Sequence, residues 1–223
     1  MNKKNIEDII QECENIDIKN ALIYANKMHR GQTRKDGTDY IYHPVNVSCN
    51  VAFYQGINSI ELIICAILHD TLEDTEATYN DLKNRFGKKI ADLVLELTTD
   101  DKIKNKLGKE KYLSIKMENM SDMALIVKLC DRLDNVNDLG NCNSDKFKNK
   151  YIKETVGILN YILDNRKLLD VHLNIIEHII QSLINLCKFD ISKTKILMDL
   201  LDKYYSLTCE ETINIKRLLL QSK

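Results

Sequence analysis

Two neighbouring groups of ionisable side chains are the residues of this sequence best suited to chemistry. His69 and Asp70 directly follow an apolar run that ends at Leu68, and Glu73 and Asp74 come one helical turn later. Burying four ionisable groups at the end of an apolar helix is costly. A bound divalent cation would remove that cost, because it is often the largest charge in its site.

Two further residues extend this group. His43 lies at the start of a predicted helix, and Asp131 interrupts the apolar segment ALIVKLCDRLDNV. On a helical wheel, Asn135 and Asp138 lie within about 40° of Asp131. Such a stripe can also be the solvated face of a helix, and a His-Asp doublet alone can be incidental. Taken together, two imidazoles and two carboxylates form a mixed nitrogen and oxygen site suited to Mn, Fe or Zn.

Glycine and proline are scarce, and this predicts the fold class. The 223 residues include seven Gly and one Pro, too few for the many turns of a sandwich or a barrel. Apolar residues instead recur at spacings of three and four, so we predict an all-α protein. The stretch 30–42 breaks this pattern and holds two of the glycines, which predicts a loop. Pro44 then opens a helix, and Gly56 ends it.

The same periodicity gives ranges for the other elements. Residues 99–111 are predicted as a lysine-rich loop or a frayed helix. Asn58 with Glu61, and Thr208 with Glu211, have the spacing of helix-capping pairs. Helical periodicity is present over 6–28, and further helices are predicted over 60–67, 78–86, 88–97, 121–139 and 146–163.

Charge and cysteine usage limit the partners and the compartment. The 32 basic and 33 acidic residues give a net charge of -1, which argues against nucleic acid as a partner. Seven scattered cysteines without a Cys-x-x-Cys motif predict free thiols in a reducing cytosol. The longest uncharged apolar run, 62–68, is too short to cross a bilayer. We therefore predict a cytoplasmic protein without a membrane partner.

Residues 164–223 have a different sequence pattern from the rest of the chain, because apolar residues recur there at heptad-like spacing. One interpretation is a helical cap on the core. The other is a dimer interface or regulatory surface, so that the protein would form a homo-oligomer through these helices.

The order His, His-Asp, Asp resembles that of the HD-domain phosphohydrolase superfamily. Three flanking segments make the likeness more specific: HRGQTRKDGTDYIYHPVNV, AILHDTLEDTEATYNDLKNRFGKKIADLVLELT and IVKLCDRLDNVNDL. Together they resemble the hydrolase domain of the RelA/SpoT alarmone family over about residues 20–160. Because no strand-rich synthetase domain follows, the chain is most similar to the stand-alone small alarmone hydrolases. The resemblance implies an HD-type metal-dependent phosphohydrolase domain over 1–163 and an extension of unknown role over 164–223.

The resemblance also implies an activity and a site. The activity would be removal of the 3′-pyrophosphate of the small-molecule nucleotides ppGpp and pppGpp, giving GDP or GTP. One Mn²⁺ ion would be held by His43, His69, Asp70 and Asp131, and the catalytic pair would be Glu73 and Asp74. The residues implied to bind substrate are Arg34, Lys35, Lys106, Asn135 and Tyr151.

Three acidic residues depart from the family pattern. Asp134 stands where a ring is usual, Asp39 where a proline is usual, and Asp138 where long family members tend to have Thr. The added negative charge leaves the preferred base open. Two alternatives therefore stay open: a related phosphohydrolase acting on an adenine alarmone or on NADPH, and a nucleotide-binding module without catalysis.

Overall fold

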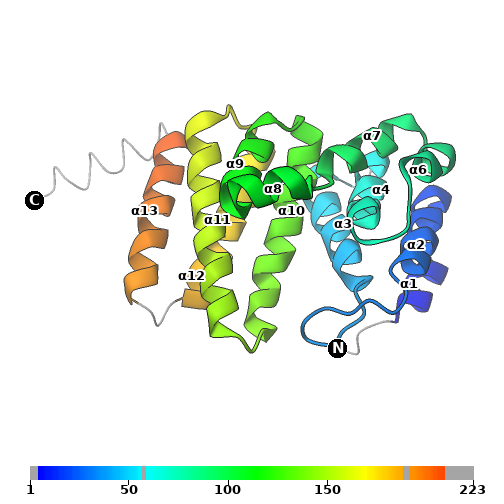
Figure 1. Cartoon of the computed structure of the whole chain (residues 1–223), viewed down its shortest axis with the longest axis horizontal. Coiled ribbons are helices and arrows are strands. Elements are labelled where there is room, and N and C mark those ends of the chain that lie inside the picture. Colours follow the sequence, from blue (N-terminus) through cyan, green and yellow to red (C-terminus); the bar gives the residue numbers. More distant parts are fainter. Residues whose placement is uncertain (1–4, 57–58, 188–190, 209–223) are drawn as a thin grey trace, which may run out of the picture.

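The computed structural model describes residues 5–56, 59–187 and 191–208, and within this part of the chain the regular elements are all helical (Figure 1). The prediction of an all-α protein is confirmed. Five helices and a short turn of helix form one half of the molecule. They are α1 (Ile6–Glu12), α2 (Ile16–Met28), α3 (Tyr42–Gln55), α4 (Ile60–Leu68), α5 (Thr71–Asp74) and α6 (Tyr79–Phe86).

The remaining helices continue from this half across to the other. They are α7 (Lys88–Leu97), α8 (Asp101–Leu107), α9 (Lys109–Asn119), α10 (Asp122–Asp138), the 3-10 helix η1 (Leu139–Asn141), α11 (Asp145–Asn165), α12 (Asp170–Cys187) and α13 (Ile191–Thr208). No helix among the described residues is long and apolar enough to cross a membrane.

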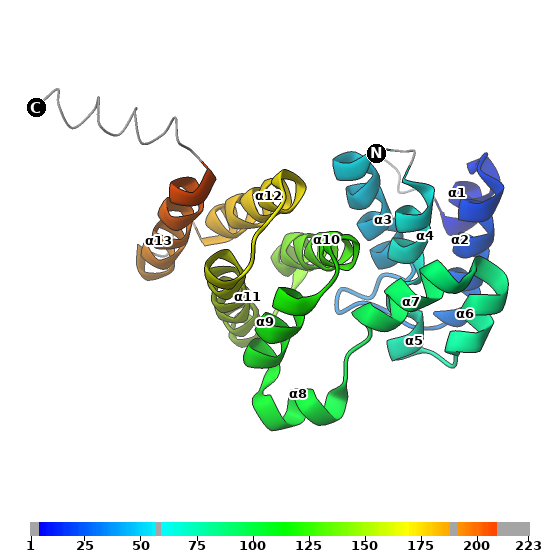
Figure 2. The ribbon, with the colours of Figure 1, turned by 90° about the horizontal axis from the view of Figure 1, so that it is seen from above.

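Helix α10 joins the two halves. It packs against α3 and α4 on one side and against α12 on the other, and it lies between these groups when the molecule is seen from above (Figure 2). Helix α4 is the most deeply buried element, because every residue from Leu62 to Leu68 is shielded from solvent. The apolar run that precedes His69 is thus the centre of the core, and it holds the adjoining polar turn in place.

The segment after α7 differs from the prediction. A loop or frayed helix is predicted over 99–111, and the structure has the two helices α8 and α9 instead. Asp100 caps α8 by accepting a hydrogen bond from the backbone of Ile103. Gly108, with φ of +82°, separates the two helices, a conformation that glycine adopts without steric cost. Leu113 and Met117 form a buried face on α9 that polar neighbours mask in the sequence.

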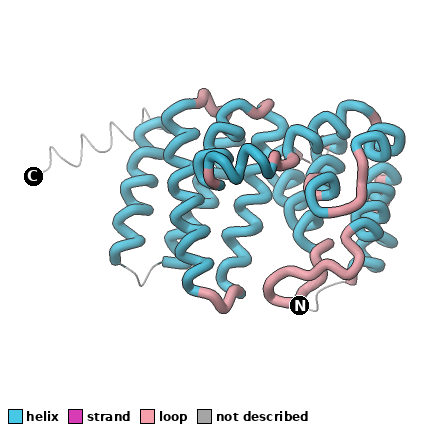
Figure 3. Tube along the Cα trace, in the orientation of Figure 1, coloured by secondary structure: helices cyan, strands magenta, loops and turns pink. Residues whose placement is uncertain are grey.

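The other boundaries agree with prediction more closely. Thr78 and Asp81 form a complete capping box at α6. The cap of α4 is Ser59, without a side-chain bond, and the predicted cap residue Asn58 lies outside the described residues, as does Glu211. The predicted loop between α2 and α3 is confirmed and crosses the end of the α3–α4 pair (Figure 3).

Candidate metal centre and nucleotide pocket

The four predicted metal ligands converge from three helix ends and one helix interior. His43 lies in the first turn of α3, His69 is the C-cap of α4, Asp70 is the N-cap of α5, and Asp131 lies within α10. The candidate ligand atoms of His43, His69 and Asp131 all lie within 4.8 Å of one another. Asp70 Oδ2 lies 3.0 Å from His69 Nε2 and 3.6 Å from His43 Nε2.

The two imidazoles present the same nitrogen to the centre of this cluster. His69 Nδ1 lies 2.8 Å from the carbonyl oxygen of Ala66, and His43 Nδ1 lies 2.6 Å from Asp134 Oδ2. Both Nδ1 atoms therefore donate to an oxygen, which leaves each Nε2 facing the carboxylates. His69 Nε2 is buried, makes no well-formed hydrogen bond and faces Asp70 Oδ2 at 3.0 Å. Two imidazole nitrogens that face two carboxylates form a donor set that suits a divalent transition metal.

The charges of the cluster are strongly coupled. Burial lowers the pKa of His43, but Asp131 and Asp134 outweigh it and raise that pKa to about 9. Burial raises the pKa of Asp131, but Lys128 and the two histidines outweigh it and hold that pKa well below its usual range. The carboxylates are therefore charged at neutral pH, and the metal-free cluster balances them with protons and with Lys128.

The predicted catalytic pair lies on α5, next to the cluster. Glu73 Oε2 accepts a hydrogen bond of 2.9 Å from the backbone of Thr99. The Tyr40 hydroxyl lies 2.5 Å from Asp70 Oδ2 and 3.5 Å from Asp74 Oδ2. Burial raises the pKa of Asp74, and the neighbouring charges of Asp70 and Glu73 raise it further. A carboxylate with a raised pKa is a better proton acceptor, so the position suits a general base.

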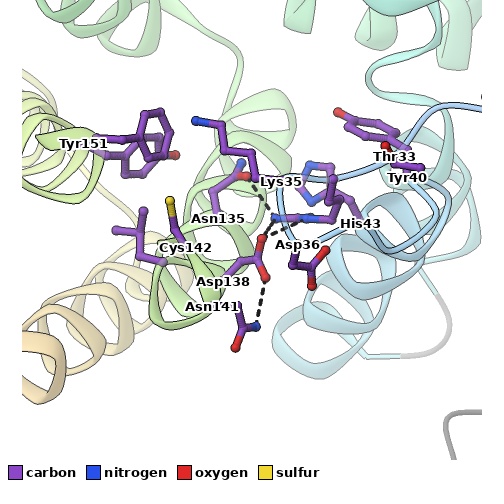
Figure 4. A pocket seen from close by; sticks show the side chains of 13 residues that line it. Thr33, Lys35, Asp36, Tyr40, His43, Asn135, Asp138, Asn141, Cys142 and Tyr151 are labelled. Atoms are coloured by element: carbon purple, nitrogen blue, oxygen red, sulfur yellow. Dashed lines mark hydrogen bonds and ion pairs between the residues drawn. The ribbon is translucent and has the colours of Figure 1, made fainter. Parts of the chain in front are cut away.

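A cavity of about 220 Å³ opens beside the cluster (Figure 4). It shares His43 with the metal centre, and its wall also includes Asn135 and Asp138 of α10. Four of the five residues predicted to bind substrate line it: Arg34, Lys35, Asn135 and Tyr151. The structure therefore places four of the five predicted substrate residues in a cavity that adjoins the predicted metal ligands through His43.

Arg34 is held tightly by α10. Its Nε lies 3.0 Å from Asp138 Oδ2, and its Nη1 lies 2.9 Å from Asp134 Oδ2. Its Nη2 lies 3.4 Å from Asn135 Oδ1. Two of the acidic departures from the family pattern thus bind an arginine that was predicted to bind substrate. Each of its three nitrogens has a partner on α10, and Arg34 still lines the cavity.

The opposite wall of the cavity is aromatic. Lys35 Nζ lies 2.7 Å from the ring centre of Phe147, and that ring lies 6.0 Å from the ring of Tyr151. Asn135 Nδ2 donates to Asp131 Oδ1 at 2.5 Å, so Asn135 also supports a metal ligand. Phe147 was not among the predicted site residues. It is a single aromatic residue among polar residues in the first turn of α11, and nothing in the local sequence pattern indicates a binding site there.

Lys106 is not brought to the cavity. Lys106 is exposed on α8 and does not line the cavity. Its predicted contact with substrate stays a proposal. Lys128 contacts the ligand cluster, and Lys116 donates a hydrogen bond to the carbonyl oxygen of Thr98 and is affected by the charges of Lys128 and Glu73, although neither lysine lines the cavity. Lys128 Nζ is 2.9 Å from Asp131 Oδ2, and burial together with Lys128 lowers the pKa of Lys116 to about 8. Lys128 was not among the predicted site residues. Its position three residues before Asp131 on the same helix is the sequence signal that could have indicated the ion pair.

Comparison with known proteins gives a consistent result. Residues 21–167 match the family described as HD domain. A guanosine-3′,5′-bis(diphosphate) 3′-pyrophosphohydrolase of Aquifex aeolicus is 42% identical over 151 residues, which cover 64% of this chain and 20% of that protein. The bifunctional (p)ppGpp synthase/hydrolase SpoT of Escherichia coli K12 is 37% identical over 146 residues, which cover 63% of this chain and 20% of that protein.

Shorter relatives match over more of their length. The Homo sapiens protein named guanosine-3′,5′-bis(diphosphate) 3′-pyrophosphohydrolase MESH1 is 37% identical over 136 residues, 60% of this chain and 75% of that protein. A solved structure described as a metazoan ortholog of SpoT that hydrolyzes ppGpp aligns with a TM-score of 0.62 and 27% identity. That alignment covers 76% of this chain and 97% of the other. The chain thus spans a fifth of the long bacterial relatives and three quarters of the human one.

Proposed function

The chain belongs to the HD domain family, and from that premise we propose that it hydrolyses the 3′-pyrophosphate of (p)ppGpp, releasing GDP or GTP and pyrophosphate. The observation that carries the proposal is that His43 belongs both to the ligand cluster and to the wall of the cavity. A nucleotide in the cavity would therefore have its ribose phosphates beside the cluster. The names of the bacterial and human relatives support the same substrate.

The proposed cofactor is one Mn²⁺ ion, held by His43, His69, Asp70 and Asp131. The support for a divalent metal is the pair of buried Nε2 atoms of His43 and His69, which face the charged carboxylates of Asp131 and Asp70. When bound, a divalent cation neutralises the charge of phosphoryl oxygens and makes water more acidic. Manganese is proposed because the resemblance to the alarmone hydrolases implies it, and iron and zinc stay as alternatives because a ligand set that mixes imidazole with carboxylate suits all three.

The protein's own side chains would supply the remaining chemistry. Asp74, with its raised pKa, would take the proton of the attacking water, and Glu73 would orient that water. Lys116 and Lys128 would balance the charge of the pyrophosphate. Because the whole protein is nearly neutral, attraction of a polyanionic substrate has to come from such a local concentration of cations.

The base would lie at the far end of the cavity, against Tyr151 and Phe147. Lys35 would be the cation at that end of the cavity, since the positive charge of Arg34 is already paired with Asp134 and Asp138. This arrangement keeps an adenine alarmone or NADPH as rival substrates, because a ring wall stacks on any purine. Under the alternative of a nucleotide-binding module without catalysis, the protein would bind ppGpp and release no pyrophosphate.

The deciding experiment is pyrophosphate release from ppGpp by the purified protein, with and without Mn²⁺. We expect turnover that needs Mn²⁺ and that is lost in the Asp74→Asn variant. A parallel panel of ppApp and NADPH separates the rival substrates. Binding of ppGpp without pyrophosphate release in Mn²⁺ would contradict the proposed activity.

Two wider features belong to the same proposal. Cys13, Cys49, Cys65, Cys130 and Cys142 are free thiols in the described part of the chain, which supports a reducing compartment such as the cytoplasm. Helices α12 and α13 pack on each other and α12 packs on α10. They leave Leu186, Ile196 and Leu207 exposed. A homo-oligomer through these helices stays a proposal, and light scattering of the purified protein tests it.

A further inference from the structure

We propose that Asp134 is a positioning residue, which holds the imidazole of His43 in the orientation that metal binding needs. One carboxylate oxygen of Asp134 makes both of its key contacts. Its Oδ2 lies 2.6 Å from His43 Nδ1 and 2.9 Å from Arg34 Nη1. The inference rests on the metal centre of the proposed function, and it assigns a role to a residue outside the ligand set.

The geometry fixes the ring of His43 at both nitrogens. With Nδ1 held by Asp134, Nε2 lies 3.2 Å from Asp131 Oδ1 and 3.6 Å from Asp70 Oδ2. An imidazole whose second nitrogen donates to a carboxylate has a fixed tautomer and a fixed ring plane, and it is a more basic ligand. Rotation of the ring away from Asp134 would withdraw Nε2 from the cluster.

His69, the other candidate ligand histidine, has its Nδ1 held by the backbone rather than by a side chain. His69 Nδ1 bonds to the carbonyl oxygen of Ala66, within the last turn of its own helix. That acceptor belongs to the backbone and no side-chain substitution removes it. His43 lies in the first turn of α3, and its acceptor comes from α10. The orientation of His43 therefore depends on one replaceable side chain.

Arg34 is the charge partner of Asp134 in this nearly buried setting. The Asp134 side chain is only 11% exposed, and an unpaired buried carboxylate would be strongly destabilising. The guanidinium of Arg34 compensates that charge, and the same guanidinium contacts Asp138 Oδ2 at 3.0 Å. Asp138 has no recorded contact with His43 among the described residues. Asp138 is therefore a matched control, since it shares Arg34 with Asp134 and lacks the histidine.

The test is the Mn²⁺ affinity of the full chain, measured by calorimetric titration with MnCl₂. We expect Asp134→Ala to weaken Mn²⁺ binding by about 10-fold to 100-fold, the usual effect of removing a carboxylate behind a ligand histidine. Asp134→Asn, which retains an acceptor oxygen, should recover part of that loss. Asp138→Ala should stay within about threefold of the wild type, because His43 keeps its partner.

A spectroscopic signature separates positioning from a general loss of structure. In the Co²⁺-loaded protein, the visible absorption bands report the ligand field, and they should shift in Asp134→Ala and stay unchanged in Asp138→Ala. Far-ultraviolet circular dichroism confirms that each variant is folded. If Asp134→Ala does not fold, Asp134→Asn carries the comparison with Asp138→Asn.

Two results would overturn the inference. One is wild-type Mn²⁺ affinity in both Asp134 variants. The other is an equal loss in the Asp138 variant, which would assign the effect to the loop that carries Arg34. Because the readout is metal binding, it decides the role of Asp134 even if the purified protein leaves ppGpp intact, a result that would contradict the proposed function alone.

Discussion

Lys128 lies one helical turn before Asp131 on α10, and its Nζ is 2.9 Å from Asp131 Oδ2. Both side chains are only 12% exposed. Burial lowers the pKa of Lys128, but Asp131 and Asp70 outweigh it and raise that pKa above its ordinary value. Lys128 therefore supplies a positive charge to the metal-free cluster. A bound divalent ion would also compensate the negative charges of the carboxylates.

Replacing Lys128 tests this relationship. Lys128→Met keeps most of the volume of the side chain and removes its charge, which leaves Asp131 buried without its partner. We expect the free energy of unfolding in EDTA to fall by about 3–5 kcal/mol, the usual cost of breaking one side of a buried pair. With saturating Mn²⁺ the loss should be smaller, because the ion replaces the missing charge. Urea denaturation in EDTA and in Mn²⁺ measures both values, and equal losses would show that the ion does not compensate these charges.

The metal ligands give the second prediction. His69→Ala and Asp131→Ala should each abolish Mn²⁺ binding and pyrophosphate release, while the helical content stays largely intact. The physical reason is that each supplies a ligand atom within 4.8 Å of the others. Wild-type protein should also melt at a higher temperature with Mn²⁺, because the ion binds only the native state. Full activity of either variant after chelation and Mn²⁺ re-addition would show that the ligand assignment is wrong.

The third prediction concerns Glu73 and Asp74, the acidic pair on α5. Glu73→Gln and Asp74→Asn should retain Mn²⁺ and lose turnover by about 10²-fold to 10⁴-fold, the usual size of a general-base effect. The raised pKa of Asp74 places it with the proton acceptor rather than with the ligands. Calorimetry with MnCl₂ and steady-state kinetics on ppGpp are compared in the same variants. An equal loss of metal affinity would make the pair ligands instead.

Part of the candidate ligand cluster is visible in the sequence alone, because His69 and Asp70 directly follow an apolar helix that has to be buried. The addition of His43 and Asp131 needed the order of the motifs and the family resemblance. The stripe of Asp131 on its helix had two interpretations, a solvated face or a site. The structure excludes a solvated face for Asp131, which is buried beside Lys128 and His43.

The contacts of Arg34 could not be predicted in the same way. Its partners Asp134 and Asp138 lie about one hundred residues further along the chain, and helical periodicity carries no information on which loop meets which helix face. Helix α9 was missed for another reason. Its inward face is narrow, and the lysines and glutamates around it hide the spacing of Leu113 and Met117.

Metal affinity should depend on pH through His43. The pKa of His43 is raised to about 9 in the metal-free protein, so below pH 9 its imidazole carries a proton that the metal must displace. The apparent Mn²⁺ affinity should therefore rise by about tenfold per pH unit between pH 6.5 and 8.5, with one proton released. Calorimetry in two buffers with different ionisation enthalpies counts that proton.

The same shift has a consequence for stability. A raised pKa in the folded state means that His43 stabilises the metal-free protein fully below about pH 6.5, and that this contribution is lost as pH rises through about 9. Thermal melting of the metal-free protein should follow that direction. A flat Mn²⁺ affinity without proton release would contradict the protonation of the cluster.

The last prediction concerns which lysine attracts the pyrophosphate. The pKa of Lys116 is lowered to about 8, first by burial and then by Lys128. The ammonium is therefore charged below pH 8 and loses its charge as pH rises through 8. At saturating Mn²⁺, kcat/KM on ppGpp should fall above pH 8, because this quantity reports the groups of the free enzyme. Lys116→Arg keeps its charge at all these pH values and should remove the fall.

Lys106 is the comparison, since it is exposed on α8 whereas Lys116 is half-buried on α9, and neither lysine lines the cavity. Lys116→Met should lower kcat/KM by about 10-fold to 100-fold, as expected for losing a charged hydrogen bond of about 1.5–3 kcal/mol. Lys106→Ala should have a smaller effect that disappears at high salt, because the charge of an exposed lysine is screened. Steady-state kinetics from pH 6.5 to 9.5 at two ionic strengths distinguishes them. If Lys106→Ala costs more than Lys116→Met and flattens the pH profile, the phosphates lie against α8 and the placement of Lys116 is wrong.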